Sequence, residues 1–367
     1  MRAHLESGLL VDLASRNLAA SVVAANDELF AERENLIRPE PATHVVGAFG
    51  PKGKLYDGWE TRRRREAGFD WAIVRLGAAG IVHGVVVDTA FFRGNYPPEI
   101  SVEATSVEGY PSPAELQAAA WETIVARSPA EGDTENPYQV TDRRRWTHVR
   151  LCIYPDGGVA RFRVHGEVVP DPRFLVGTVD LVAMENGGRL VSCSDAFYSS
   201  PSNLILPGRA RVMGDGWENA RRRGPGNDFA VFALAAPGAI RHVEVDTSYF
   251  VGNAPGWVRV SALDARTAKL DEDDAWQEVL PRTAVQPDTR HRYRPGPAGL
   301  SPVPPAATHV RLDVFPDGGL ARFRVHGVLT PEGFEAAWLR WWDALPLPHR
   351  DQLAATGTSL ESLSAQS

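Results

Sequence analysis

The chain has 367 residues, enough for two ordinary domains that each bury a hydrophobic core. It carries 39 Lys and Arg residues against 46 Asp and Glu residues, a formal charge of −7, and its basic residues form short clusters, which excludes a nucleic-acid-binding surface as its main feature. No run approaches the ~18 apolar residues of a membrane span, and the start lacks the pattern of a signal peptide. These features predict a folded cytoplasmic protein that binds neither nucleic acid nor membrane.

The chain contains a tandem duplication, which becomes visible when its segments are taken in order. Each copy opens with a faintly shared segment, continues with an acidic pair, a Trp and an arginine cluster, and runs through apolar segments to a hairpin. The hairpin sequences THVRLCIYPDGGVARFRVHG and THVRLDVFPDGGLARFRVHG agree at sixteen of twenty positions. The period of about 160 residues indicates two duplicated domains and not a solenoid. In order, the matching pairs are 25–37 and 193–205, DGWETRRRR at 57–65 and DGWENARRR at 215–223, 58–98 and 216–256, and the hairpins at 147–166 and 308–327.

Short β-strands dominate both copies. Segments such as DWAIVRLG and IVHGVVVDT are rich in β-branched residues and are bounded by Gly, Asn and Pro. In the first hairpin, alternation about the PDGG turn places Phe162 and Val164 inward, and Arg161, Arg163 and His165 on a solvated outer face. Many short strands with polar connections predict an all-β fold of two tandem jelly-roll β-sandwich domains with little helix.

The Pro and Gly residues between 170 and 185 are typical of a domain junction. We therefore expect a first domain at 1–178 and a second at 179–345. The segment PEGFEAAWLRWWDAL at 331–345 is the best helical candidate, and residues 346–367 are predicted to form a loose tail.

The acidic pair and the arginine cluster keep the same order in both copies. Arginine can hold a carboxylate through two parallel hydrogen bonds, while Asp and Glu accept from N–H donors, so the combination suits a small anion with amide-like groups. Arg62 is opposite Ala220 in the other copy and is expected to be solvated. An alternative remains open, in which the Asp caps a turn, the Trp packs in the core or a loop, and the arginines are solvated. The corresponding residues are Asp57, Trp59, Glu60 and Arg63 to Arg65 in the first copy, and Asp215, Trp217, Glu218 and Arg221 to Arg223 in the second.

A second repeated motif reads VDTAFFRGN at 87–95 and VDTSYFVGN at 245–253. Its polar groups follow a strand, which puts them at the rim of a sandwich, where loops carry function. The alternative is a turn stabilised by the Asp and a left-handed Asn. No pair of histidines has the spacing of a dedicated metal site, and no phosphate-binding glycine loop is present, so the sequence predicts neither metal nor cofactor.

The motifs DGWETRR, VDTAFFRGNYPP and GWENARRRGPGNDF, together with the two hairpins, closely resemble the allantoicase family. The resemblance runs through both copies, and Asn219 stands where a Thr is more usual. It implies two jelly-roll domains similar to galactose-binding-like carbohydrate modules. It also implies hydrolysis of a small molecule, allantoate, to ureidoglycolate and urea.

The chemistry of allantoate, which bears a carboxylate and two ureido groups, gives the expected roles. Arginines would hold the carboxylate, and Asp or Glu would move protons. Because the first copy keeps the fuller motif, we expect Glu60 to do the acid–base work there. The expected catalytic residues are Glu60, Asp57, Asp88 and Glu218. The expected substrate contacts are Trp59, Arg63, Arg64, Thr89, Asn95, Asp215, Arg221, Arg222, Asp246, Thr247 and Asn253.

A competing hypothesis is a double carbohydrate-binding module without catalysis. Such a module would favour exposed aromatic residues and a calcium-holding loop over paired arginines. The duplication is compatible with two similar sites or with one site shared by the two copies. A homo-oligomer is also compatible with the sequence.

Overall fold

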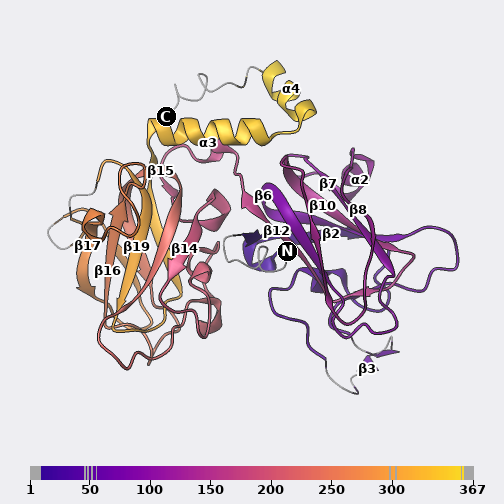
Figure 1. Ribbon diagram of the computed structural model, residues 1–367, viewed down its shortest axis with the longest axis horizontal. Coiled ribbons are helices and arrows are strands. Elements are labelled where there is room, and N and C mark those ends of the chain that lie inside the picture. Colours follow the sequence, from indigo (N-terminus) through magenta and orange to yellow (C-terminus); the bar gives the residue numbers. More distant parts are fainter. Residues whose placement is uncertain are drawn as a thin grey trace. The chain divides into compact units, whose positions relative to one another are not determined.

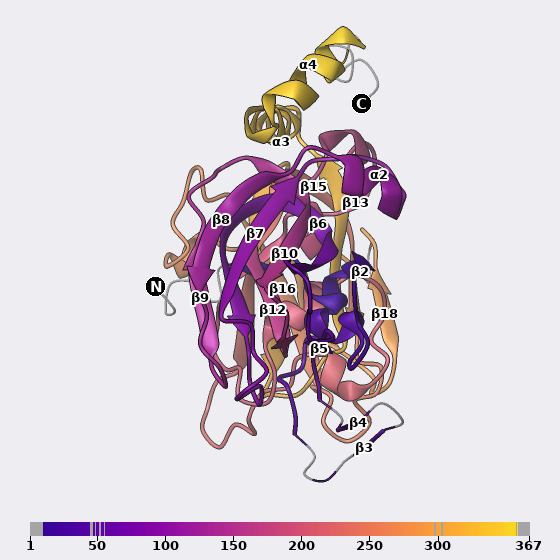
Figure 2. The ribbon, with the colours of Figure 1, turned by 90° about the vertical axis from the view of Figure 1, so that its right-hand side faces the viewer.

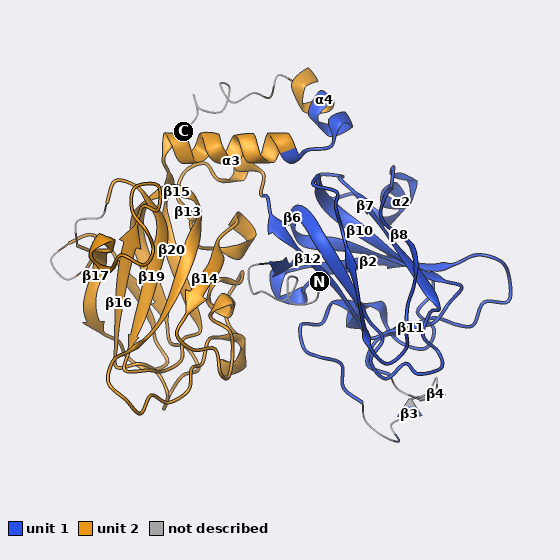
Figure 3. Cartoon of the chain, in the orientation of Figure 1, with its two compact units in different colours: residues 1–169, 344–351 blue, residues 170–343, 352–367 orange. Residues whose placement is uncertain are grey.

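The structure is a computed structural model that describes residues 10–44, 47, 49–50, 53–54, 56–296, 299–301, 304–356 and 358. The chain divides into two compact units, residues 1–169 with 344–351 and residues 170–343 with 352–367 (Figure 3). The sequence placed the boundary after residue 178, whereas the first unit ends its main segment at residue 169.

The first unit is built mainly from strands and contains the short α-helix α2 at Pro113–Ala118. Ser112 caps that helix, since its hydroxyl accepts from the Glu115 N–H and the Glu115 carboxylate returns the bond. The strands are β1 at Val11–Asp12, β2 at Ser21–Ala25, β3 at Phe49–Gly50, β4 at Gly53–Lys54, β5 at Trp59–Glu60, β6 at Asp70–Asp88, β7 at Glu99–Thr105, β8 at Glu122–Pro129, β9 at Glu135–Gln139, β10 at Arg145–Tyr154, β11 at Gly158–Val159 and β12 at Arg161–Val168.

The long strand β6 joins the two layers of the first sandwich. Its first half pairs with β2 and β10, and its second half pairs with β9 and β12. Strands β7 and β8 continue the first layer beyond β10 (Figure 2). The register of β10 along β6 shifts between Trp146 and His148, which is how a strand turns the corner from one sheet to the other.

The second unit repeats this arrangement around the equally long strand β15 at Asp228–Asp246 (Figure 1). Strand β15 pairs with β14 and β19 in its first half and with β18 and β20 in its second. The structure thus confirms the predicted all-β fold and its duplication. The remaining strands of the unit are β13 at Val179–Asp180, β14 at Arg189–Cys193, β16 at Trp257–Leu263, β17 at Gln277–Ala284, β18 at Arg290–Tyr293, β19 at Ala307–Phe315 and β20 at Arg322–Leu329.

Alternation along the hairpin strand β12 correctly predicts the core residues Phe162 and Val164 but fails for Arg161. Phe162 and Val164 are fully buried, as predicted. Arg161, which was expected on a solvated face, is only 2% exposed. The expectation was wrong because alternation decides the face on which a side chain lies, and a loop covers that face here.

The predicted helix at 331–345 is present as α3 at Pro331–Ala344. Thr330 begins it, accepting the Phe334 N–H on its carbonyl oxygen and the Gly333 N–H on its hydroxyl. The segment expected as a loose tail instead starts with a helix, α4 at Leu347–Ala355, while residues 357 and 359–367 lie outside the described residues. None of the described helices is long and apolar enough to cross a membrane.

Gly80→Ala is expected to destabilise the first unit. A Cβ atom at Gly80, near the corner of β6, would lie 2.1 Å from the carbonyl oxygen of Glu167 on β12, so the paired strands would have to move apart. Overpacking of this kind costs about 1–3 kcal/mol. Gly94→Ala is the control, because a Cβ there has no atom within 4 Å. Urea unfolding would measure both, and equal free energies of unfolding for the two variants would contradict the prediction.

Candidate functional site

The two-residue strand β5 presents Glu60 because it buries Trp59. Trp59 is fully buried, its indole N–H donates to the Asp27 carbonyl at 2.8 Å, and β5 pairs with β11. Since neighbouring side chains of a strand point to opposite faces, Glu60 lies on the other side. Trp217 is buried in the same way, with its N–H 3.0 Å from the Asp195 carbonyl. Both tryptophans thus pack in the interior, and the expected substrate contact of Trp59 stays a prediction.

Glu60 contacts the second repeated motif. The Asn95 amide donates to its carboxylate at 2.7 Å, and in the second unit the Asn253 amide donates to Glu218, also at 2.7 Å. The Gly158 N–H donates to the Asn95 carbonyl, so the asparagine is fixed by the hairpin turn. Burial raises the pKa of Glu60, and the hydrogen bond from Asn95 offsets part of that rise. Sequence motifs 35 residues apart thus meet in one carboxylate–amide pair, which is present in both repeats.

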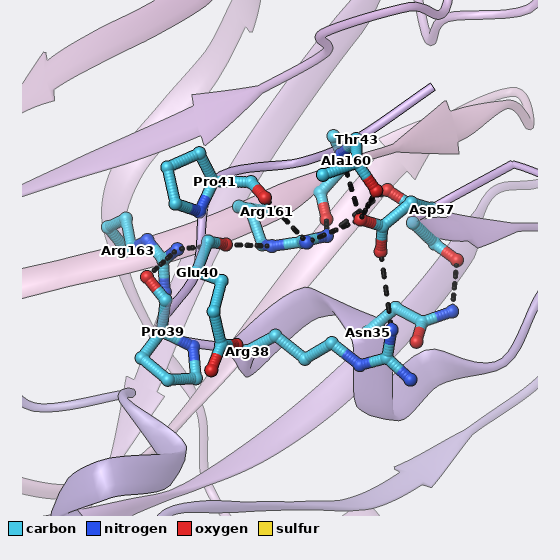
Figure 4. Close-up of polar contacts among 11 residues, drawn as sticks. Asn35, Arg38, Pro39, Glu40, Pro41, Thr43, Asp57, Ala160, Arg161 and Arg163 are labelled. Atoms are coloured by element: carbon cyan, nitrogen blue, oxygen red, sulfur yellow. Dashed lines mark hydrogen bonds and ion pairs between the residues drawn. The ribbon is translucent and has the colours of Figure 1, made fainter. Parts of the chain in front are cut away.

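Asp57 serves a buried arginine (Figure 4). The Arg161 guanidinium donates to the Asp57 carboxylate at 2.8 Å and to its backbone carbonyl at 3.1 Å. Thr43 donates to the same carboxylate through its N–H at 2.9 Å and its hydroxyl at 3.2 Å. Burial raises the pKa of Asp57, but the bonds from Arg161 and Thr43 outweigh this and leave it below its usual value. A carboxylate so engaged is a poor proton donor, so the predicted catalytic role of Asp57 is not supported.

The second unit has the same buried arginine with a different carboxylate arrangement. Arg322 donates to the Asp215 backbone carbonyl at 2.7 Å, and burial lowers its pKa to about 10. The Asp215 carboxylate instead accepts from the Arg211 N–H at 2.8 Å and from its guanidinium at 3.1 Å. Asp215 is therefore an ion-pair partner on its own loop, and the structure gives no sign of the predicted substrate contact.

The two Asp-Thr pairs shape turns at the ends of β6 and β15. Asp88 accepts the Ala90 N–H at 2.8 Å, and Asp246 accepts the Ser248 N–H at 2.9 Å. Burial raises the pKa of Asp88, and nearby Glu135 raises it further, against opposing effects of the Ala90 N–H and two arginines. Asp88 is part-exposed, whereas Asp246 is only 2% exposed.

The threonines of these pairs are structural. Thr89 is fully buried and its hydroxyl donates to the carbonyls of Glu131 and Thr134, and Thr247 does the same with Gln286 and Thr289. A hydroxyl without exposure and with its proton committed cannot reach a ligand from solvent. The expected substrate contacts of Thr89 and Thr247 are not supported, since the turn uses both groups.

The arginines of the cluster have different environments. Arg64 and Arg222 pair with Asp70 and Asp228, carboxylates buried at the starts of β6 and β15. Arg62, expected to be merely solvated, holds Asp27 with its backbone N–H and its guanidinium. Arg63 and Arg221 are exposed, and within the part of the chain that the structure describes neither makes a hydrogen bond or an ion pair. Only these two guanidinium groups of the predicted contacts are free to meet a ligand.

Thr61 and Asn219, which were not among the predicted site residues, hold the PDGG turn against the segment that follows the Trp-Glu pair. The Thr61 hydroxyl accepts the Gly157 N–H at 3.2 Å, and the Asn219 side-chain oxygen accepts the Gly318 N–H at 2.8 Å. Asn219, which departs from the usual Thr, therefore performs the same task. Arg161 was also missed, although its repetition as Arg322 was a signal. Across the described ranges, no group of three or more His, Cys, Asp or Glu side chains could hold a metal ion.

Comparison with known proteins agrees with the duplication. A family model described as the allantoicase repeat matches residues 11–169 and again residues 179–330. The probable allantoicase of Streptomyces coelicolor is 51% identical over 336 residues, which cover 88% of this chain and 86% of the relative. That of Nocardia farcinica is 53% identical over 323 residues, covering 87% and 94%. The crystal structure of the allantoicase from Saccharomyces cerevisiae has a TM-score of 0.74 at 34% identity and covers 89% of this chain and 97% of its own.

Asp57→Asn is expected to destabilise the first unit by about 3 kcal/mol at pH 7, because it leaves the buried Arg161 without its counter-charge. Glu99→Gln is the control, since Glu99 and its partner Arg127 are exposed and such pairs contribute less than about 1 kcal/mol. The folded pKa of Asp57 lies below its usual 3.8, so the difference from wild type should persist above pH 3.8 and narrow only as the pH falls through the folded pKa. Urea unfolding at several pH values measures it. Equal losses of unfolding free energy in Asp57→Asn and Glu99→Gln would contradict the assignment of Asp57 as the counter-charge of Arg161.

Proposed function

Because the chain belongs to the allantoicase family, we propose that its carboxylate–amide pairs act on allantoate, which it hydrolyses to ureidoglycolate and urea. The protein is a hydrolase of a ureido carbon–nitrogen bond with a small-molecule substrate. The family match through both repeats supports this activity over the alternative of a carbohydrate-binding module without catalysis.

The reaction sets three tasks for the site. The bond between the central carbon of allantoate and one ureido nitrogen breaks, and the oxygen of a water molecule bonds to that carbon. The water gives up a proton and the leaving nitrogen gains one, so that urea departs intact. The site therefore needs a group that takes and returns a proton, hydrogen-bond partners for the urea, and a cation for the carboxylate.

Glu60 suits the proton-transfer task better than the other predicted carboxylates. It is part-exposed, and its pKa is raised by burial, so it takes up a proton more readily than an ordinary glutamate. Asn95 holds one of its carboxylate oxygens. Ionised Glu60 takes the proton of the attacking water and returns it to the leaving nitrogen. The Glu60–Asn95 pair is the single observation that carries this proposal.

Arg63 suits the binding of the substrate carboxylate. It follows Glu60 by three residues, is exposed, and has no polar partner among the described residues. A planar guanidinium can grip a carboxylate through two parallel bonds. Arg64 is committed to Asp70 and so fixes the course of the segment that carries Arg63. Arg221 would have the corresponding role in the second repeat.

Asp88 and the second repeat have supporting roles in this proposal. Asp88 lies beside Arg161 and Glu135 and keeps a raised pKa, which makes it a second candidate for proton transfer. Asp57 positions the segment through Arg161. Cytoplasmic location, homo-oligomeric assembly, independence of metals and cofactors, and the lack of nucleic-acid and membrane partners all stay predictions.

Glu60→Gln is expected to lower kcat for urea release by ~10²-fold or more, because Gln keeps the size and the bond to Asn95 but cannot take a proton. Glu218→Gln is expected to cost less, since the first repeat keeps the fuller motif. A colorimetric urea assay with allantoate measures both rates, and melting temperatures check folding. Glu99→Gln, at an exposed carboxylate of the same unit, should keep the wild-type rate.

The pattern of losses decides which repeat works. A large loss in both glutamine variants would mean that both repeats are needed for activity. Full activity in Glu60→Gln with a collapse in Glu218→Gln would contradict the assignment and move the chemistry to the second repeat.

A further inference from the structure

The outer face of the second layer differs between the repeats in a way that the reaction does not explain. In the second unit, β15 pairs Glu244 with Arg324 of β20 on one side and with Arg292 of β18 on the other. Residues directly opposite in an antiparallel sheet share a face, so these three side chains form one row. Toward the C-terminal end of β15, the next row consists of Asp246 with Arg322 on β20 and Arg290 on β18. Toward the other end, the next row consists of His242 with His326 on β20, and His326 in turn pairs with Asp180 on β13.

The same registers identify the corresponding positions of the first unit. There Val86 lies between Arg163 and Pro137, Asp88 lies between Arg161 and Glu135, and Gly84 lies beside His165, which pairs with Asp12. With histidines neutral, the nine positions of the second unit carry four arginines and three carboxylates, 4 − 3 = +1. The nine corresponding positions of the first unit carry two arginines and three carboxylates, 2 − 3 = −1. The duplication has therefore made this face basic in one repeat only.

The basic face is organised around one buried carboxylate. Glu244 is 7% exposed at its side chain and accepts from Arg290 at 2.5 Å, while Arg292 approaches it only to 3.4 Å and stays 61% exposed. One buried acid thus pairs with two guanidinium groups, of which Arg290 is 37% and Arg292 61% exposed at the side chain. His242 and His326 stack beside them with ring centroids 4.3 Å apart.

Arg324 adds an unsatisfied donor. Its Nη2 donates to the carbonyls of Leu206 and Gly208, and its nearest carboxylate is Asp180 at 3.5 Å. Its Nη1 is buried and has no hydrogen-bond partner among the residues that the structure describes. Leaving a charged buried donor without a hydrogen-bond partner costs free energy, so Arg324 adds uncompensated positive charge beneath this face. Burial lowers the pKa of His326, Glu244 opposes that shift, and Arg324, Arg290 and Arg292 lower the pKa further.

We propose that this face of the second repeat, formed by Arg290, Arg292, Arg324, His242 and His326, binds a small oxyanion that carries a phosphate or carboxylate group. Forked guanidinium groups match the oxygens of either group in pairs, and imidazoles supply further donors. The site uses none of the residues of the Glu–Asn pairs and does not depend on the proposed reaction. The first repeat lacks this site. Val86 stands there in place of Glu244, Pro137 in place of Arg292, and Glu135 in place of Arg290.

Isothermal titration calorimetry of the full chain in low-salt buffer at pH 7 tests the proposal, with inorganic phosphate as one probe and glycolate as the other. The wild type is expected to bind at least one of the two probes. Binding of inorganic phosphate shows that the site takes a phosphate group, and binding of glycolate shows that it takes a carboxylate group. Arg292→Ala should weaken binding about tenfold or more, the loss expected for a charge-assisted hydrogen bond, and Arg292→Glu should abolish it. Both changes are at an exposed side chain, so folding should be retained.

Arg266→Ala is the matched control. Arg266 is also an exposed arginine of the second unit, and it pairs with its neighbour Asp264. The Arg266→Ala variant should bind the anion as the wild type does. The Glu60→Gln variant should also bind it, and that result would distinguish this site from the proposed catalytic one. Binding of neither probe by the wild type, or equal binding by Arg292→Glu and wild type, would overturn the proposal.

Discussion

Both repeats depend on a buried arginine at the start of the returning hairpin strand. Arg161 donates to the backbone carbonyls of Asp57 and Ala160, and Arg322 donates to those of Asp215 and Ala321. Each arginine thereby ties the loop before the Trp-Glu pair to the hairpin. A guanidinium taken out of water must have its donors satisfied, so this loop has little freedom to move. The Trp that follows is buried beneath it, and the Glu takes the opposite face toward its Asn.

This shared frame carries different chemistry in the two repeats. In the first, the Asp57 carboxylate neutralises the arginine directly, whereas in the second Asp215 turns to Arg211 on its own loop. The carboxylate–amide pair is the same in both, with equal distances of 2.7 Å. The frame tolerates such change because the arginine contacts backbone carbonyls, which do not vary with the side chain.

The duplication and the all-β fold could be predicted from the sequence because repeated motifs and alternation are local signals. Glu60 and Asn95 were each predicted, but their contact was not, since it depends on how the loops close over the sandwich end. The same closure buries Trp59 and Thr89, which the sequence placed at the substrate, and Arg161, which it placed in solvent. Alternation assigns a side chain to a face and says nothing of what covers that face. Among neighbouring arginines, only the structure separates Arg64, paired with Asp70, from the free Arg63.

The pH dependence of kcat/KM for urea release from allantoate, compared between wild type and Asn95→Leu, tests the central claim most directly. Ionised Glu60 is the proposed base, so activity should fall as the pH decreases through its pKa, which burial places above the usual 4.5. The Asn95 hydrogen bond lowers that pKa, so removing it should move the acidic limb of the Asn95→Leu profile to higher pH. An acidic limb at the same pH in both proteins would contradict the account, because the titrating group would then not be the glutamate that Asn95 holds.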